Sequence, residues 1–292
     1  MADSNDTLQS LIIDTVLAFC RSPENVLQAA SAEPAWDEPL VGFAGGDDAI
    51  FQQYKQAVGP FHWTPLEAFA LAFPDAPAAA HDLTVVAWVL PQTEATKADN
   101  RQEQVYPAER WARARIFGEN VNVLLRRKVV AALRDAGYQA VAPVLLPEFG
   151  TRPSEQYVLA SNWSERHMAY ASGLGTFGLC DGLITPKGKA MRVGSVVVRG
   201  SVAPTPRPYT DHHAYCLYYS EGTCGECIDR CPVKAISKAG HDKIKCNNHL
   251  ERTKPFVREH FGFEGYGCGM CQTGVPCESG IPRSKLGAAR VA

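Results

Sequence analysis

The sequence predicts an α/β domain over residues 1–203 and a small cysteine-rich module over residues 204–292. Valine-rich apolar runs alternate with segments of helical periodicity before residue 200, a pattern typical of α/β domains. The segment 201–210 contains three prolines and forms the linker. Beyond it the hydrophobic periodicity ends and eight cysteines follow. Because this tail has too few large apolar residues for an independent core, something else must hold it together, and metal ligation can supply that folding energy.

Composition bounds the class of protein. The chain has 292 residues, of which 46% are hydrophobic and 21% charged, so it is globular and shows no bulk disorder. Its formal net charge is −2, which provides no electrostatic case for binding nucleic acid. We therefore expect no nucleic-acid partner.

The first predicted element is an amphipathic surface helix. Its apolar residues recur at helical spacing: Leu8, Leu11, Ile12, Val16 and Phe19. The segment lacks the basic start and cleavage site of a signal peptide, and the chain has no apolar run of about 18 residues that would span a membrane. We expect a cytoplasmic protein without a membrane partner, in which clustered cysteines bind metal rather than form disulfides.

The elements before residue 150 follow from periodicity and from breaker residues. We predict a loop at 45–48, a helix at 64–73, a buried strand at 83–90 and a polar loop at 92–104. A long helix at 107–136 follows and ends at Gly137, and a strand at 139–146 comes next. The expected buried stripe of the long helix is Val121, Leu124, Leu125, Val129, Ala132 and Leu133.

A short helix and two strands complete the predicted α/β domain. Asn162 and Glu165 have the spacing of a capping box at the start of the helix, and Gly173 suits its end. Strands are expected at 182–185 and 191–199.

The first cysteine group resembles part of a ferredoxin run. In the sequence Cys224-x2-Cys227-x3-Cys231-Pro232, spacing and proline match the last three members of C-x2-C-x2-C-x3-C-P, in which the fourth cysteine ligates the other [4Fe–4S] cluster. The expected first member is displaced, because seven residues separate Cys216 from Cys224.

A second group lies near the C-terminus. Cys268-x2-Cys271 forms its core, and Cys277 follows after five residues where three are usual. Cys246 stands alone between the groups. The crossing rule assigns one cluster to Cys216, Cys224, Cys227 and Cys277, and the other to Cys231, Cys246, Cys268 and Cys271. Both irregular spacings then fall on the first cluster.

Two other interpretations of these cysteines are open. Pairs of C-x2-C also build structural zinc sites, and disulfides are a further alternative. The C-x2-C-x3-C-P run favours iron–sulfur clusters over both.

The cysteines and the segment 171–198 together resemble a known superfamily, that of epoxyqueuosine reductases and reductive dehalogenases. The resemblance rests on the glycine stretch 172–178 (SGLGTFG), on the run 183–186 (LITP) followed by Arg192 and Gly194, and on the double cysteine module. It covers roughly residues 80–280.

The resemblance implies a nitroreductase-like α/β domain that binds a corrinoid, cobalamin in base-off form, followed by a ferredoxin-like module with two [4Fe–4S] clusters. It further implies that a low-potential donor, ferredoxin or flavodoxin, loads the clusters, and that the cobalt reduces a small organic substrate. The sequence departs from both branches. Residues 159–162 hold no acid where epoxyqueuosine reductases carry an aspartate, and neither the helical-repeat tail of that branch nor the export signal of the dehalogenases is visible.

Candidate site residues come from two places. Tyr106, with Arg110, Arg113 and Arg115, lies near the start of the long helix, and Glu165, His167 and Tyr170 lie on the short helix. A reductive cleavage needs a proton source, so we take Tyr106, Glu165, His167 and Tyr170 as catalytic candidates. Helix capping by Glu165 and a solvated face for the arginines are the structural alternatives.

The glycine stretch is the candidate cofactor site, with Gly173, Gly175, Gly178 and Arg115. Its glycines match a dinucleotide fingerprint, but they follow a helix and open a strand, which is the reverse of that motif. We expect them to admit a flat cofactor or to form a tight turn. His213 is expected not to bind a ligand, and Cys180 is expected to be a small buried thiol.

The leading functional prediction is an iron–sulfur oxidoreductase that reduces a small organic substrate through a corrinoid. Two alternatives stay open: a two-cluster electron-transfer protein without corrinoid, and an epoxyqueuosine-type enzyme that modifies tRNA.

Overall fold

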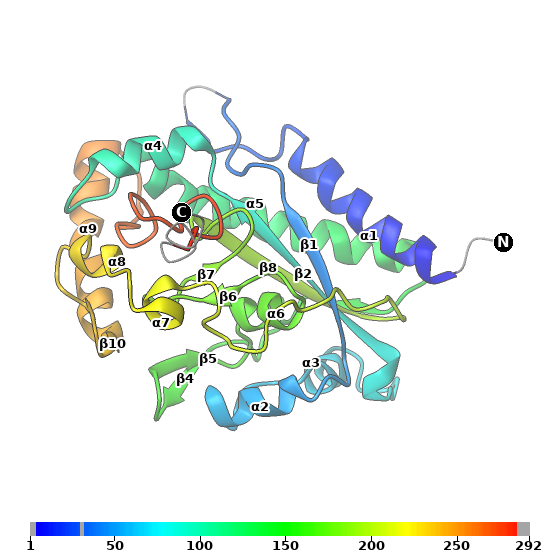
Figure 1. Cartoon of the computed structure of the whole chain (residues 1–292). Helices are drawn as coiled ribbons and strands as arrows, with labels where there is room; N and C mark the ends of the chain where they lie inside the picture. Colours follow the sequence, from blue (N-terminus) through cyan, green and yellow to red (C-terminus); the bar gives the residue numbers. More distant parts are fainter. Residues whose placement is uncertain (1–3, 30–31, 285–292) are drawn as a thin grey trace, which may run out of the picture.

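The computed structural model describes residues 4–29 and 32–284. Its centre is a four-stranded antiparallel sheet in the order β1-β2-β8-β3 (Figure 1). Strands β2 and β8 pair over their whole length, with Leu83 opposite Arg199 and Pro91 opposite Met191. The bounds of the four strands are Leu40–Gly45, Leu83–Pro91, Met191–Arg199 and Ala140–Val141, in sheet order.

Helices cover both faces of this sheet (Figure 1). One face packs against α1 (Ser4–Cys20) and α5 (Glu109–Asp135), and the other against α2 (Ile50–Ala57), α3 (Pro65–Ala72) and α6 (Glu165–Ala171). Side chains of a strand alternate between its two faces. Strand β2, which is buried along its whole length, therefore contributes to both cores: Val86, Trp88 and Leu90 to the first, and Val85, Ala87 and Val89 to the second.

The C-terminal part lies beyond one end of the sheet, on the left in Figure 1. It contains α7 (Leu217–Glu221), α8 (Glu226–Asp229), β9 (Ile236–Ser237), β10 (Gly240–His241) and α9 (Lys243–Phe261). Its buried cluster combines Cys216, Cys227 and Cys231 with apolar residues, and it also takes in Leu179, Cys180 and Ile184 from the preceding part. The two parts therefore share this third core.

Short elements fill the connections. Helix α4 spans Glu94–Gln102, and the 3₁₀ turns η1 and η2 span Ala80–Asp82 and Pro143–Leu145. Two small hairpins pair β4 (Thr151–Ser154) with β5 (Val158–Ser161), and β6 (Thr176–Phe177) with β7 (Leu183–Ile184).

The mixed helix-and-sheet fold expected from the sequence is confirmed, and so are several of its elements. Helices α1, α3 and α5, the buried strand β2 and the strands β7 and β8 all lie where the sequence predicts them. Gly137 and Gly173 follow the ends of their helices with φ of 88° and 76°, a conformation that favours glycine. Within the described residues, no helix is long and apolar enough to cross a membrane.

Other predictions of local structure are wrong. The polar segment 92–104 contains helix α4 rather than a loop, β1, α2 and α9 were not predicted, and β3 is two residues long. Leu124 is exposed instead of buried. Asn162 does not cap α6, because its amide donates to the carbonyl of Glu148 and its oxygen accepts from the Gly150 amide.

Candidate metal centre

Four of the predicted ligands line one pocket. Cys216 precedes α7, Cys224 and Cys227 flank the start of α8, and Cys277 lies in the loop after α9. Their side chains surround a pocket whose other walls include Leu179, Ile184 and Lys189. The chain therefore brings together the set that the crossing rule assigns to the first cluster, against residues of the α/β part.

The other four cysteines gather beside this pocket. Cys246 lies on α9, and Cys231, Cys268 and Cys271 lie in turns. Cys246 and Cys231 lie close enough to Cys268 to raise the pKa of its thiol. Cys268 acts on the pKa of Cys271 in the same way. Burial raises the pKa of the Cys268 thiol to about 11. A bound metal would displace that proton, since thiolate is the ligand form.

The donor set fits iron–sulfur clusters. All cysteines of the described residues have free thiols, and the eight candidate ligands form two groups of four. An all-thiolate set of four is what a [4Fe–4S] cluster requires. A zinc site would also accept four thiolates, so the number of thiols alone does not choose between the two kinds of centre.

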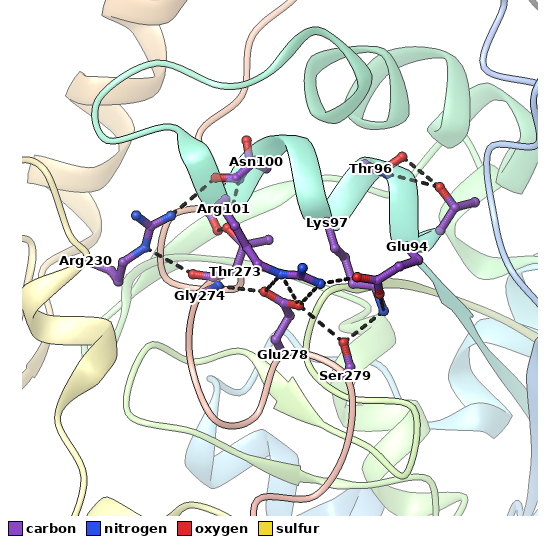
Figure 2. Close-up of polar contacts among 12 residues, drawn as sticks. Glu94, Thr96, Lys97, Asn100, Arg101, Arg230, Thr273, Gly274, Glu278 and Ser279 are labelled. Atoms are coloured by element: carbon purple, nitrogen blue, oxygen red, sulfur yellow. Dashed lines mark hydrogen bonds and ion pairs between the residues drawn. The ribbon is translucent and has the colours of Figure 1, made fainter.

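Helix α4 holds the loop that carries Cys277 (Figure 2). Nε of Arg101 donates to both oxygens of Glu278, at 2.8 and 3.1 Å, and Nζ of Lys97 donates to Oγ of Ser279 at 2.8 Å. Glu278 itself accepts from the amide of Gly274 at 2.6 Å. The five-residue spacing before Cys277 is thus a folded loop with its own internal support.

The side-chain amide of Asn100 forms a second set of hydrogen bonds between helix α4 and the loop that carries Cys277. The side chain of Asn100, fully buried, donates to Oγ1 of Thr273 at 3.0 Å and to the carbonyl of Cys268 at 3.2 Å. From the other side, Arg230 donates to the carbonyls of Thr273 and Asn100 (Figure 2). Helix α4 therefore contacts the loop on both sides of Cys271.

The catalytic candidates on α6 lie in three different environments. Glu165 pairs with Arg126 at 3.0 Å and accepts from Ser195, although burial raises its pKa. The imidazole Nδ1 of His167 lies 2.7 Å from Oγ of Ser164, and burial lowers its pKa well below the usual value.

Burial raises the pKa of the Tyr170 phenol, which is protonated at neutral pH even at its ordinary pKa of about 10. Its ring packs on Phe177 and Tyr209 at centroid distances of 5.8 and 5.1 Å. Among the three α6 candidates, Glu165 forms an ion pair, whereas His167 and Tyr170 are both uncharged at neutral pH and each carries one proton.

The candidates from the start of α5 lie elsewhere. Tyr106 stacks on Phe256 of α9, with ring centroids 4.2 Å apart. The guanidinium of Arg115 lies over the ring of Tyr266 and donates to its hydroxyl. Arg110 pairs with Glu33 and Asp99, and Arg113 with Glu109. Each of these side chains therefore already has a partner within the chain.

The glycine stretch makes close contacts within the chain. A Cβ on Gly173 would lie 2.6 Å from the carbonyl oxygen of Pro206, and one on Gly175 would lie 2.2 Å from that of Ile184. Gly178 is less crowded, with a nearest contact of 3.3 Å. The first two glycines thus let backbone pack on backbone, and they do not form the cradle expected for a flat cofactor.

Near the module, Asp211, His212 and His213 place their ligand atoms within 4.8 Å of one another. The first two are exposed, and the ring of His213 stacks on Tyr219. That His213 binds no cofactor stays a prediction.

Sequence reasoning missed the groups that support the cysteines. Asn100, Arg101 and Glu278 were not singled out, and neither was Lys189, whose side chain is 2% exposed. The polar pattern of 92–104 held no apolar signal that could have revealed the first two. The pair of lysines in the turn at 185–190 was the available sign of the last.

The fold and the cysteines define a class: an α/β domain joined to a module with two four-cysteine sets. No family model matches the chain. Among curated proteins, the epoxyqueuosine reductases of Bacillus anthracis and Staphylococcus aureus are each 32% identical to it over 124 residues. These matches cover 40% of this chain and 30% of each relative, so the chain is matched to about a third of its relatives' length.

Solved structures extend the likeness to the fold. An epoxyqueuosine reductase crystallised with a tRNA stem loop has a TM-score of 0.51 and 18% identity, covering 96% of this chain and 67% of that one. A catabolic reductive dehalogenase has a TM-score of 0.50 and 15% identity, covering 94% and 37%. The resemblance to the epoxyqueuosine reductase and reductive dehalogenase superfamily is confirmed: the chain shares its fold and has sequence similarity to its epoxyqueuosine reductases.

Proposed function

We propose that this chain is an iron–sulfur oxidoreductase in which two [4Fe–4S] clusters pass single electrons into the α/β domain. The observation that carries the proposal is the pocket shared by Cys216, Cys224, Cys227 and Cys277, whose lining also includes three residues of the α/β domain: Leu179, Ile184 and Lys189. A cluster held there would lie against the domain in which a substrate is reduced. The division of the chain near residue 203 is part of this proposal.

The residues of the chain have separate tasks in this proposal. The first four cysteines would hold one cluster, and Cys231, Cys246, Cys268 and Cys271 the other. The two clusters supply one-electron transfer from a low-potential donor such as ferredoxin or flavodoxin. Leu179 and Ile184 are buried beside the first set and exclude water from it. Tyr170 is the candidate for delivering a proton from its phenolic oxygen to a small organic substrate.

Cobalamin is the acceptor that the superfamily resemblance implies. Bound there, it would supply a metal able to reduce an organic substrate. Gly173 and Gly175 do not fit as its cradle, since each is closed by backbone of the chain itself. We therefore derive no step through cobalt, and cobalamin binding is left to experiment.

The first test is anaerobic purification and cluster reconstitution in the presence of hydroxocobalamin. We expect about eight iron atoms per chain, as two [4Fe–4S] clusters require. Retention of stoichiometric corrinoid with base-off absorbance would identify cobalamin as the acceptor. An iron content well below eight would contradict the two-cluster proposal. Full iron without retained corrinoid would leave a two-cluster electron-transfer protein.

A second candidate function is an epoxyqueuosine-type reduction on tRNA. It is favoured by the similarity to epoxyqueuosine reductases and by the solved relative bound to a tRNA stem loop. For this reason the expected lack of a nucleic-acid partner stays a prediction. Binding of a tRNA stem loop by the reconstituted protein would support the second candidate, and failure to bind would remove it.

A further inference from the structure

Lys189 is a lysine buried among cysteines. It lies in the turn between β7 and β8, and its side chain is 2% exposed. Its methylene groups pack over Gly182, where an added Cβ would come within 2.9 Å of them. The side chain lines the same pocket as Cys216, Cys224 and Cys277.

The backbone of this turn fixes the lysine against the cysteine loop. The amide of Lys189 donates to the carbonyls of Cys277 and Glu278 at 2.8 and 3.0 Å, and the amide of Ala190 donates to Glu278 at 3.2 Å. Gly188 has a φ of 86°, and a Cβ there would lie 2.0 Å from the carbonyl oxygen of Glu278. The turn and the loop therefore form one rigid contact.

The charge neighbours of the Lys189 ammonium are sulfur atoms. The side chain of Lys189 lines the pocket together with Cys227 and Cys277, and at Gly182 its methylene groups lie beside Sγ of Cys180. Lys187, two residues earlier, instead reaches Glu38 at 3.7 Å on the surface. A buried ammonium needs a compensating negative charge, and cluster thiolates are the groups placed to provide it.

We propose that Lys189 is a positioning charge that stabilises the reduced form of the cluster held by Cys216, Cys224, Cys227 and Cys277, an inference that rests on the proposed function. With four thiolates, a [4Fe–4S] cluster changes its net charge from −2 to −3 when it accepts one electron, and no proton moves. A fixed positive charge in a low-dielectric pocket favours the more negative state. A higher potential of this cluster would favour electron transfer toward the α/β domain.

The test is a redox titration of the reconstituted protein, reduced stepwise with dithionite and followed by electron paramagnetic resonance. The first cluster of the Lys189→Met variant is compared with that of the wild type at the midpoint potential of the wild-type cluster. There we expect the ratio of reduced to oxidised cluster to fall about tenfold. For a one-electron couple this corresponds to a midpoint potential lowered by about 59 mV. Lys189→Arg keeps the charge and should stay near the wild type. Lys187→Met removes a surface lysine of the same turn and should change neither midpoint.

The outcomes separate the inference from the proposed function. Unchanged midpoints in a Lys189→Met protein with full iron would overturn the role of Lys189 and leave the clusters standing. Wild-type protein with far fewer than eight iron atoms would overturn both. If Lys189→Met and a further variant, Lys189→Gln, assemble no first cluster but Lys189→Arg does, the positive charge is needed for assembly, which supports the inference. If Lys189→Arg also fails to assemble this cluster, the shape of the lysine rather than its charge matters, and the inference is overturned.

Discussion

Gly188 shows how one missing side chain couples the sheet to the cysteine loop. Its φ of 86° is matched by the 88° of Gly137 at the end of α5, so both positions strain any other residue. They differ in space, because a Cβ at Gly137 meets nothing within 4 Å whereas one at Gly188 meets the carbonyl oxygen of Glu278. Substitutions at these two glycines therefore distinguish the cost of backbone strain, which both share, from the cost of a steric collision, which arises at Gly188.

We predict that Gly188→Ala destabilises the holoprotein far more than Gly137→Ala does. Positive φ costs both variants about 1 kcal/mol, and the collision adds roughly 1–3 kcal/mol to the first. Urea denaturation of both variants measures the difference, and iron analysis shows whether Gly188→Ala loses metal. Equal loss of unfolding free energy in the two variants would contradict the close contact with Glu278.

Helix α4 is stabilised by polar contacts rather than by an apolar face. Thr93 caps its first turn by accepting from the amide of Thr96, and its buried residues are Thr96, Lys97 and Asn100. Asn100 supports the loop on which Cys268 and Cys277 lie. The helix therefore links the α/β domain to the candidate metal centre.

We expect Asn100→Ala to lower the unfolding free energy of the holoprotein by about 3 kcal/mol, since buried hydrogen-bonding groups lose their partner. Release of iron to a chelator should be faster in this variant. Gln102→Ala truncates an exposed amide on the same helix, and it should stay within about 0.5 kcal/mol of the wild type. Equal iron release from the two variants would argue against a role of α4 in supporting the loop.

The elements that could be predicted are those that bury apolar side chains periodically. The apolar periodicity of the sequence predicts strand β2 and helix α5 for this reason. Helix α4 does not, because its buried side chains are polar, and α9 is obscured by Pro255 in its interior and by only three buried residues. The cysteine spacing indicated the two ligand sets, whereas Lys189 and Asn100 act through contacts across the chain that no local pattern records.

The described part of the chain has two conventional hydrophobic cores and a third in which cysteines and apolar side chains are mixed. The first two are made of aliphatic and aromatic residues around the sheet, and the burial of apolar surface stabilises them without metal. The third depends on the cysteines of the C-terminal part. Its stability should therefore depend on metal.

We predict that removal of iron by oxidation and chelation unfolds the C-terminal part and spares the sheet. Hydrogen exchange measured by mass spectrometry should show protection lost in α7, α8 and α9 and kept in β2 and β8. Reconstitution with iron and sulfide should restore it. Full protection of α9 in the iron-free protein would contradict a metal-dependent third core.

The hydrogen bonds from Lys189 and Ala190 to the loop at Cys277 have a consequence for biogenesis. The turn that offers these amides is synthesised long before Cys277 emerges from the ribosome, and the sheet it belongs to can form without the tail. The proposed first cluster, by contrast, lacks one ligand until residue 277 has been translated. The turn before β8 would then already be in place to bind the loop of Cys277 through the amides of Lys189 and Ala190. The order of translation would in this way set the order of cluster assembly.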